Sequence, residues 1–467
     1  MTELETDYLV VGAGATGMAF TDALIGESDA EVVMVDRRHR PGGHWNDDYP
    51  FVRLHQPSAL YGVLSRTLGH DRIDDTGPNA GFYERATAAE ICDYYGRVLD
   101  EHLVPSGQVR FLGMHDHVGG NGGPGGEHHL RSVLTGAETT VRVRRRVVDA
   151  TYMESSLPST SPPPFAVDPD ARVVAPNDLV SLAGAPSGFT VIGAGKTSMD
   201  TCYWLVDNGV DPDAIRWIRP RDGWTNDRAA IQPLRLVAGF AEWLAAMNEA
   251  GAAATDVRDL CLRLEDAGVL MRLDPAVEPA FFRGAISGES ERATLRTIGN
   301  VVRMGRVRHV GTTRIELEHG SIPTDAGHVH VDCTAAGLAC PPNRTVFEPG
   351  RITPQWIQNG LAPFNAALIG WVEANRDDDT ERNRLCPPNG FTPEADARNL
   401  ARQWAATQRA VASWTAEPDL NAWLGTCRLT PLGNAGDHLG PAMDALIRML
   451  QHQEAAISNL ENLVAEP

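Results

Sequence analysis

Two glycine-rich segments have the residue types and spacing to bind the phosphates of a dinucleotide. The first contains Gly12, Gly14 and Gly17 in the pattern G-x-G-x-x-G, directly after the apolar run 8–11. In such a loop the first glycine permits a tight turn, the second lets backbone N–H groups approach a pyrophosphate, and the third lets a helix pack closely on the strand. Asp36 ends the next apolar run, where a carboxylate can accept the 2′-hydroxyl of an adenosine ribose and repel a 2′-phosphate.

The second segment, residues 193–198, differs from the first where the third glycine is expected. It again follows a short apolar run, but Ser198 stands in place of that glycine. A phosphate loop of the G-x-x-x-x-G-K-[ST] kind is excluded because it would need glycine where Thr190 stands. We therefore predict a second dinucleotide site, formed by Gly193, Gly195, Lys196, Thr197 and Ser198.

The residues downstream of the two loops predict different dinucleotides. The spacing that places Asp36 after the first loop leads to Trp217 after the second, and two arginines follow, Arg219 and Arg221. Because arginine can bind a 2′-phosphate bidentately, the second site is expected to prefer NADPH to NADH. Lys196, the only lysine of the chain, would then lie over the pyrophosphate, or it is a surface lysine without such a role.

The elements that must position these loops are two βαβ units. We predict an α/β fold with two Rossmann-like dinucleotide-binding domains, a helical insert and a helical C-terminal region. The proline- and serine-rich stretch Ser155–Pro164 cannot be regular structure and indicates a crossing between domains. The predicted boundaries are 1–160 for the first part of the first domain, 161–325 for the second domain with its insert at about 234–300, 326–375 for the return to the first domain, and 376–467 for the helical C-terminal region.

Composition excludes several classes of partner. The 61 acidic residues outnumber the 41 basic ones, and the net charge of −20 argues against nucleic acid and anionic membranes as partners. No uninterrupted apolar run approaches the ~20 residues of a membrane helix, and the start of the sequence is acidic where a signal peptide would be basic. The seven cysteines form no C-x-x-C pair, so we expect reduced thiols, no metal site and a cytoplasmic location, with a homo-oligomer possible.

Together the two loops resemble those of two-dinucleotide-binding flavoproteins. Three further segments resemble the flavin-dependent class B monooxygenases, which include N-hydroxylating enzymes. Pro41–Trp45 is similar to the G-G-x-W segment that those enzymes place beside the flavin, and Val148–Tyr152 is similar to their A-T-G strand end, with Tyr152 in place of glycine. Val331–Ala335 resembles the strand by which the chain returns to the FAD domain. The resemblance covers roughly residues 5–375.

The resemblance implies FAD in the first site and NADPH in the second. It adds Arg37, Gly43 and Trp45 to the residues expected to bind FAD. In the resembled enzymes an amide side chain near this point lies by the flavin and hydrogen-bonds the oxygen adduct; Gln56 matches it, with His55 next. The implied activity is formation of a C4a-hydroperoxyflavin from O2 and oxygenation of a small nucleophilic substrate, first of all N-hydroxylation of an amine or amino acid, with sulfur second.

The sequence differs from the class B enzymes at one motif, and two alternative functions therefore stay open. The class B enzymes carry a fingerprint of the form F-x-G-x-x-x-H before the second loop, but Phe165–Leu179 contains neither histidine nor glycine. This favours a flavin-dependent NADPH oxidase or dehydrogenase without oxygen transfer. A non-catalytic flavin-binding regulator is the other alternative, and the two arginines after the second loop argue against it.

Overall fold

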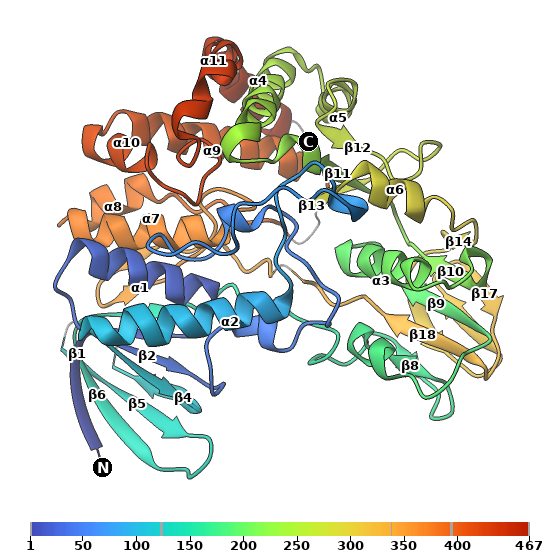
Figure 1. Ribbon diagram of the computed structural model, residues 1–467, viewed down its shortest axis with the longest axis horizontal. Coiled ribbons are helices and arrows are strands. Elements are labelled where there is room, and N and C mark those ends of the chain that lie inside the picture. Colours follow the sequence, from blue (N-terminus) through green and yellow to red (C-terminus); the bar gives the residue numbers. More distant parts are fainter. Residues whose placement is uncertain (1, 122–124, 338, 393–395, 466–467) are drawn as a thin grey trace.

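The first glycine loop belongs to an eight-stranded sheet in the N-terminal part of the chain (Figure 1). The protein is described by a computed structural model that covers residues 2–121, 125–337, 339–392 and 396–465. The strand order is β19-β20-β6-β1-β2-β3, and the hairpin β4–β5 pairs with β6. The strands are β1 (Thr2–Val11), β2 (Val32–Asp36), β3 (Val109–Gly113), β4 (His115–Gly120), β5 (Gly126–Ser132), β6 (Glu138–Asp149), β19 (Phe347–Glu348) and β20 (Arg351–Ile352).

Helices cover one face of this sheet, and the β4–β5 hairpin covers the other. Alternate residues of β1 point to opposite faces, as a strand requires. Val10 packs in the core formed with α1 (Ala15–Glu27), α2 (Ala88–Val98) and α7 (Ala362–Asn375), whereas Leu9 packs against strands β5 and β6. The sheet is therefore buried on both faces.

The second glycine loop belongs to a separate parallel sheet of order β14-β10-β9-β18-β8. Helix α3 (Lys196–Asp207) follows β9 directly, so the loop again lies at the carboxyl end of a central strand. The strands of this sheet are β8 (Val173–Val174), β9 (Gly188–Ile192), β10 (Ile215–Ile218), β14 (Val301–Val302) and β18 (His328–Asp332). A four-stranded sheet beside it contains β7 (Ala166–Val167), β15 (Val307–Val310), β16 (Arg314–Leu317) and β17 (Gly320–Pro323).

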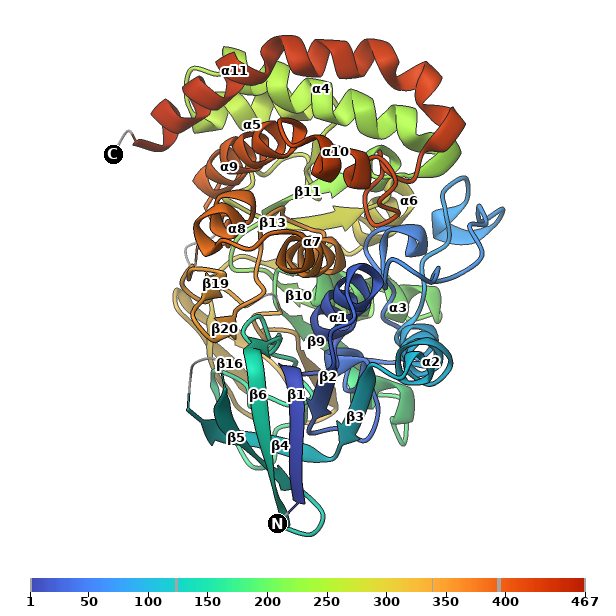
Figure 2. The ribbon, with the colours of Figure 1, turned by 90° about the vertical axis from the view of Figure 1, so that its left-hand side faces the viewer.

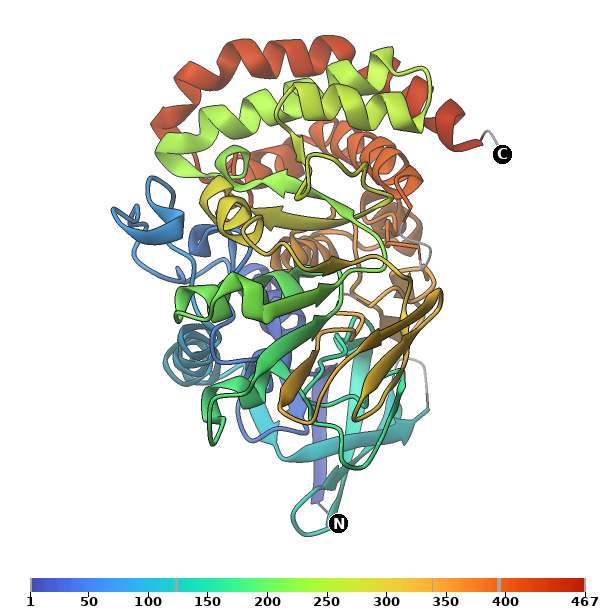
Figure 3. The same cartoon turned by 90° about the vertical axis from the view of Figure 1, so that its right-hand side faces the viewer.

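A layer of helices crosses one end of the molecule (Figures 2 and 3). Helices α4 and α11 lie side by side in it although about 200 residues separate them in sequence: the side chain of Asn248 donates to the carbonyl of Met449 at 2.9 Å. They share one apolar core with α5 and α9. The remaining helices are α4 (Val237–Ala253), α5 (Val257–Asp266), α6 (Glu289–Leu295), α8 (Asp379–Leu385), α9 (Arg398–Thr415), α10 (Pro418–Leu424) and α11 (Met443–Ala465). Of these, α8, α9 and α10 also contribute residues to the core of the first domain.

The structure differs from the predicted organisation at two places. The insert at 234–300 is not purely helical, since β12 (Leu270–Met271) and β13 (Phe281–Ser287) pair with β11 (Gly223–Asp227). Gly284, with φ of +70°, and the register shift against β11 interrupt the alternation that would reveal β13. Strand β18 pairs with β9 in the second sheet, so the chain does not return to the first sheet at residue 326. The returning strands are β19 and β20, two residues each, too short to show a period.

Candidate functional site

Two glycines of the first loop are required by its geometry, Gly12 by its backbone conformation and Gly17 by lack of space. Gly12 has a φ of +101°, a conformation that side chains rarely adopt. A Cβ atom on Gly17 would lie 1.9 Å from the carbonyl oxygen of Gly12. Helix α1 begins at Ala15, and no side chain caps its first turn. Its free backbone N–H groups and the positive end of its dipole can therefore receive an anion.

Asp36 organises this loop from the end of β2. It is buried, and its carboxylate accepts the backbone N–H of Ala13 at 2.7 Å and that of Arg38 at 2.8 Å. Each carboxylate oxygen can accept a further bond from a ligand hydroxyl. Arg37 lies at the surface and forms an ion pair with Glu154 at 2.5 Å. The carboxylate of Glu154 therefore partly neutralises the guanidinium of Arg37 in the protein without ligand.

The segment with the predicted flavin contacts lies directly against the first loop. A Cβ on Gly43 would come within 2.9 Å of the Cα of Gly14, and Gly42 donates its N–H to the carbonyl of Ala13 at 2.9 Å. Two residues on, the indole of Trp45 donates to the hydroxyl of Tyr61 at 2.7 Å. The structure therefore brings Gly14, Gly43 and Trp45 together, although 29 residues separate the two glycines.

The second loop has the same strand–turn–helix arrangement, but different residues pack against its glycines. A Cβ on Gly193 would meet the carbonyl oxygen of Cys333 at 2.5 Å, whereas a Cβ on Gly195 would meet nothing within 4 Å. Ser198, at the third-glycine position, is buried and donates its hydroxyl to the carbonyl of Gly195 at 2.7 Å. Thr197 lies between them in the first turn of α3 and accepts at its carbonyl from Thr201 at 2.8 Å.

Lys196 has an acidic partner within its own helix. Its ammonium pairs with Asp200 one turn along α3, and its side chain is only 9% exposed. The other oxygen of Asp200 accepts from the hydroxyl of Tyr49 at 2.9 Å. The lysine therefore takes part in a link between the two glycine loops.

The two arginines after the second loop have different environments. Arg219 is buried, pairs with Asp222 at 2.9 Å and stacks on Trp217 at 4.6 Å. Arg221 lies over the ring of Phe281 at 4.8 Å and lines a cavity of about 490 Å³. The same cavity is lined by Pro220, Arg303, Gly305, Arg306, Glu318 and His319. Burial and the charges of Arg306 and Arg283 lower the pKa of Arg221, which is the signature of crowded positive charge.

His55 and Gln56 lie half-buried in an arch of the chain between two backbone contacts, Leu54 to Ala86 and Ser58 to Glu84, each at 2.9 Å. Burial, together with the charge of Lys196, lowers the pKa of His55 to about 3. The imidazole is therefore neutral at physiological pH. The side chain of Gln56 is uncharged at any pH, so the arch presents two neutral hydrogen-bonding groups.

A buried charge cluster next to His55 is absent from the sequence predictions. Glu291 of α6 binds Arg228 at 2.6 Å and Arg85 at 3.3 Å. Arg228 is completely buried, and its charge and that of Arg85 lower the pKa of His55. No local pattern could reveal this cluster, because Arg85 and Glu291 are 206 residues apart. It gives the neighbourhood of His55 an excess of positive charge.

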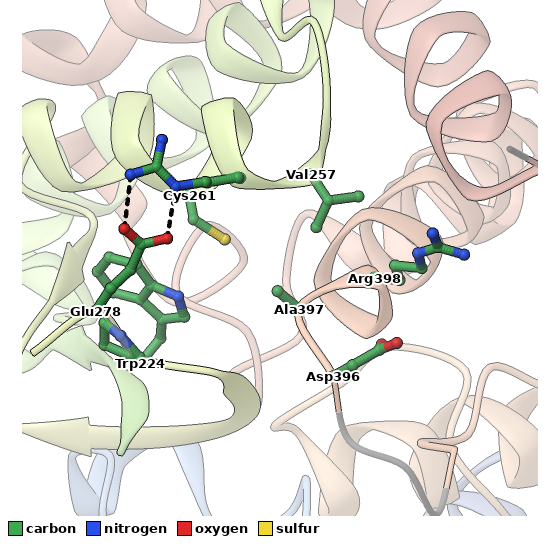
Figure 4. Close-up of a pocket in the computed structure, with 9 residues that line it drawn as sticks. Trp224, Val257, Cys261, Glu278, Asp396, Ala397 and Arg398 are labelled. Carbon is green, nitrogen blue, oxygen red and sulfur yellow. Dashed lines mark hydrogen bonds and ion pairs between the residues drawn. The ribbon is translucent and has the colours of Figure 1, made fainter. Parts of the chain in front are cut away.

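A second cavity lies in the helical layer and is lined by none of the glycine-loop residues (Figure 4). Its volume is about 300 Å³. The indole of Trp224 lies on one side of it, near the ion pair of Arg258 with Glu278 at 2.7 Å, and Arg398 lies on the opposite side. Among the described residues, no group of three or more His, Cys, Asp and Glu side chains could hold a metal ion, and no helix is long and apolar enough to cross a membrane.

Comparison with known proteins identifies the family of this chain. Residues 10–56 match the model described as an NAD(P)-binding Rossmann-like domain. The uncharacterised proteins Rv2000 and MT2056 of Mycobacterium tuberculosis and Mb2023 of Mycobacterium bovis are each 45% identical over 435 residues, which span 92% of this chain and 78% of theirs. The chain belongs to the family of these mycobacterial proteins.

Solved structures of monooxygenases have the same fold as this family member. The open crystal structure of cyclohexanone monooxygenase is 13% identical, with a TM-score of 0.51 over 97% of this chain and 98% of that one. Oxidized steroid monooxygenase bound to NADP is 12% identical, with a TM-score of 0.53 over 98% of both chains. The predicted fold class, and the predicted resemblance to class B flavin-dependent monooxygenases, are confirmed at the level of the fold.

Proposed function

We propose that the protein is an NADPH- and FAD-dependent monooxygenase that transfers one oxygen atom from O2 to a small nucleophilic substrate. The observation that carries this proposal is the junction of two unlike dinucleotide loops. The first ends in a buried carboxylate, Asp36, and the second leads to a cavity lined by arginines. The hydrogen bond from Tyr49 to Asp200 joins the segment after the first loop to the helix of the second.

The first loop suits FAD. Gly43 lies so close to Gly14 that a Cβ on Gly43 would come within 2.9 Å of the Cα of Gly14, and the absence of side chains here leaves N–H groups accessible to a pyrophosphate. The uncapped N-terminus of α1 adds a partial positive charge. Asp36 suits an unphosphorylated ribose, because its charge would repel a 2′-phosphate.

The second loop suits NADPH through Arg221 rather than Arg219. Arg219 is already neutralised by Asp222 and covered by protein. Arg221 and Arg306 line one cavity of about 490 Å³, and a 2′-phosphate there would relieve their mutual repulsion. We therefore assign recognition of the phosphate to Arg221.

The residues around the flavin edge would hold the reacting groups and exclude water. When bound, FAD supplies hydride acceptance and reaction with O2. The amide of Gln56 can donate a hydrogen bond without giving up a proton, so it can hold a reactive oxygen in place. His55, neutral because burial lowers its pKa to about 3, can orient a substrate without protonating it.

An amine is the substrate class that the electrostatics favour. Nitrogen attacks only as the neutral amine. The charges of Lys196, Arg85 and Arg228, which lower the pKa of His55, outnumber those of their partners Asp200 and Glu291. Such charge disfavours the ammonium form and lowers the pKa of a bound amine. N-hydroxylation is therefore our first assignment, with sulfur oxygenation second.

The test is rapid mixing of the NADPH-reduced holoenzyme with oxygen, followed by absorbance. A transient species between the reduced and oxidised flavin spectra, whose decay an amine accelerates, is the expected result. Direct return to oxidised flavin, with and without amines, would instead establish an NADPH oxidase, which the missing histidine of Phe165–Leu179 favours. A purified protein without any flavin spectrum would overturn the assignment of the first loop.

A further inference from the structure

Asp48 is a buried carboxylate without a cationic partner. Its side chain is 8% exposed, one oxygen accepts the backbone N–H of Tyr49 at 3.1 Å, and the other lies 3.5 Å from Nδ1 of His44. In the described chain no arginine or lysine forms an ion pair with it. The neighbouring Asp47 differs in both respects: it is 33% exposed, and Nε of Arg38 donates to it at 2.9 Å.

A second carboxylate, that of Asp200 in the helix after the other loop, acts on Asp48 through its charge. Asp200 of α3 accepts from Tyr49, the residue next to Asp48, and holds Lys196 as its own counter-ion. Burial and the charge of Asp200 raise the pKa of Asp48 to about 7. The titratable and charged groups around Asp48 are His44, Asp47, Tyr49 and Tyr61 from its own part of the chain, Cys92 from α2, and Asp200 with Lys196 from α3.

The proposed reaction requires a proton to enter this junction. NADPH, one proton, O2 and the substrate give NADP+, the oxygenated substrate and water; the hydride supplies two electrons, and one oxygen atom leaves as water. His44 and Tyr49 do not change their protonation near neutral pH. Burial lowers the pKa of His44 to about 4 and raises that of Tyr49 far above its ordinary value. Asp48 is the group whose protonation changes in the working range.

We propose that Asp48 carries the proton that each oxygen-transfer turnover consumes and passes it to His44, whose Nδ1 lies 3.5 Å from the carboxylate and which stands between Gly43 and Trp45. This inference rests on the proposed monooxygenase function. Asp48 acts through its neighbour, so it is a positioning residue for the proton and not a group that contacts the substrate. Asp48 accepts the backbone N–H of Tyr49 and Asp200 accepts its hydroxyl; only Asp200 has a counter-ion, so the proton is held on Asp48.

The test compares the holoenzyme with D48N and, as a matched control, D47N. Rapid mixing of the reduced proteins with oxygen, in the presence of a pH-indicator dye, follows proton uptake and the flavin spectrum together from about pH 5 to about pH 9. The wild type should show a change in proton-uptake rate centred near pH 7, and D47N should keep that change at a somewhat lower pH, because the charge of Asp47 also raises the pKa of Asp48. D48N should lose that change, and its rate at neutral pH should fall by about tenfold or more, the scale of a removed acid–base group.

A second measurement does not depend on turnover. Infrared difference spectra across the same pH range should contain a carboxylic-acid C=O band that titrates in the wild type and D47N and is missing in D48N. If D48N does not fold, D200N provides the test, because removal of the like charge must shift the titration of the band to lower pH. A band that titrates unchanged in D200N, or that persists in D48N, would overturn the assignment.

The outcomes separate this inference from the proposed function. A transient flavin species with the same pH dependence in wild type and D48N would overturn the role of Asp48 alone. Return to oxidised flavin without any transient species, in all the variants, would overturn the monooxygenase function and this role with it. A pH step present in wild type and D47N and absent in D48N, together with loss of the band, supports both.

Discussion

The two glycine loops have the same strand–turn–helix fold, but the contact between helix and turn differs between them. In the first loop α1 crosses β1 so closely that a Cβ at Gly17 would penetrate the carbonyl of Gly12 at 1.9 Å. In the second loop Ser198 occupies the same position, and its hydroxyl bonds to Gly195 at 2.7 Å. Gly195 itself has open space around its missing side chain. A rigid, enclosed loop suits a cofactor that stays bound, and an open loop suits one that exchanges at every turnover.

The largest expected effect comes from adding one methyl group to each loop. Gly17→Ala should destabilise the protein by about 3 kcal/mol or more and abolish FAD retention, because backbone must move to admit the Cβ. Gly195→Ala is the matched control: its φ of −93° is ordinary, and the added atom meets no neighbour. Thermal unfolding and flavin content of both variants check this. Equal Tm values for the two would contradict the described difference.

Removal of the lysine should weaken the link between the loops. Lys196→Met leaves Asp200, 15% exposed, with only the hydroxyl of Tyr49 as a partner, and should cost about 2 kcal/mol of unfolding free energy. It also leaves the negative charge of Asp200 uncompensated, so the pKa of Asp48 rises further. A carboxyl whose pKa is higher in the folded than in the unfolded state loses stabilising power as pH rises. The deficit of Lys196→Met should therefore stay constant up to about pH 7 and grow as the pH rises further to about 9, because only the variant still loses stability there.

Urea unfolding across that range measures the effect. Lys196→Arg keeps the charge and serves as the control. A deficit that is constant with pH would show that Lys196 does not communicate with Asp48.

Arg219 and Arg221 provide a contrast within the second site. Arg221→Ala should raise the KM for NADPH by about 10- to 100-fold, the value of one charge-assisted hydrogen bond, and leave that for NADH nearly unchanged. Arg219→Ala should instead lower the Tm, because Asp222 loses a buried partner and Trp217 its stacked guanidinium. Steady-state kinetics with both nucleotides decide between them. A loss of NADPH selectivity in Arg219→Ala alone would reverse the assignment.

The loops could be predicted from sequence because their determinants are local. Gly12, Gly14 and Gly17 stand between an apolar run and a helix, and each fits a position that the turn requires. The roles of Gln56 and His55 stay predictions, because no described contact identifies a ligand for them. Asp48 gave no signal in the sequence: its elevated pKa depends on Asp200, about 150 residues away, and on burial that only the folded chain creates.

Other differences come from tertiary context or from very short elements. The i,i+4 spacing of Lys196 and Asp200 on a predicted helix could have revealed their ion pair. The partner of Arg219 is only three residues away, yet its burial follows from stacking on Trp217 inside the second sheet. The return to the first sheet could not be located because β19 and β20 have two residues each. Motifs formed by neighbouring residues could be predicted from the sequence, whereas ion pairs between residues far apart in the chain could not.

The smallest expected effect tests whether the second loop would gain from the glycine that it lacks. Ser198→Gly removes the hydroxyl bond to Gly195 and adds backbone freedom in the first turn of α3. Both changes destabilise, by about 1 kcal/mol in total. The loop is already open enough for a nucleotide, so NADPH affinity should stay within about twofold. Isothermal titration and thermal unfolding of this variant measure the two quantities. A tighter NADPH complex would show that the Ser198 side chain obstructs the nucleotide. The serine would then not be a feature that helps the second loop to bind and release NADPH.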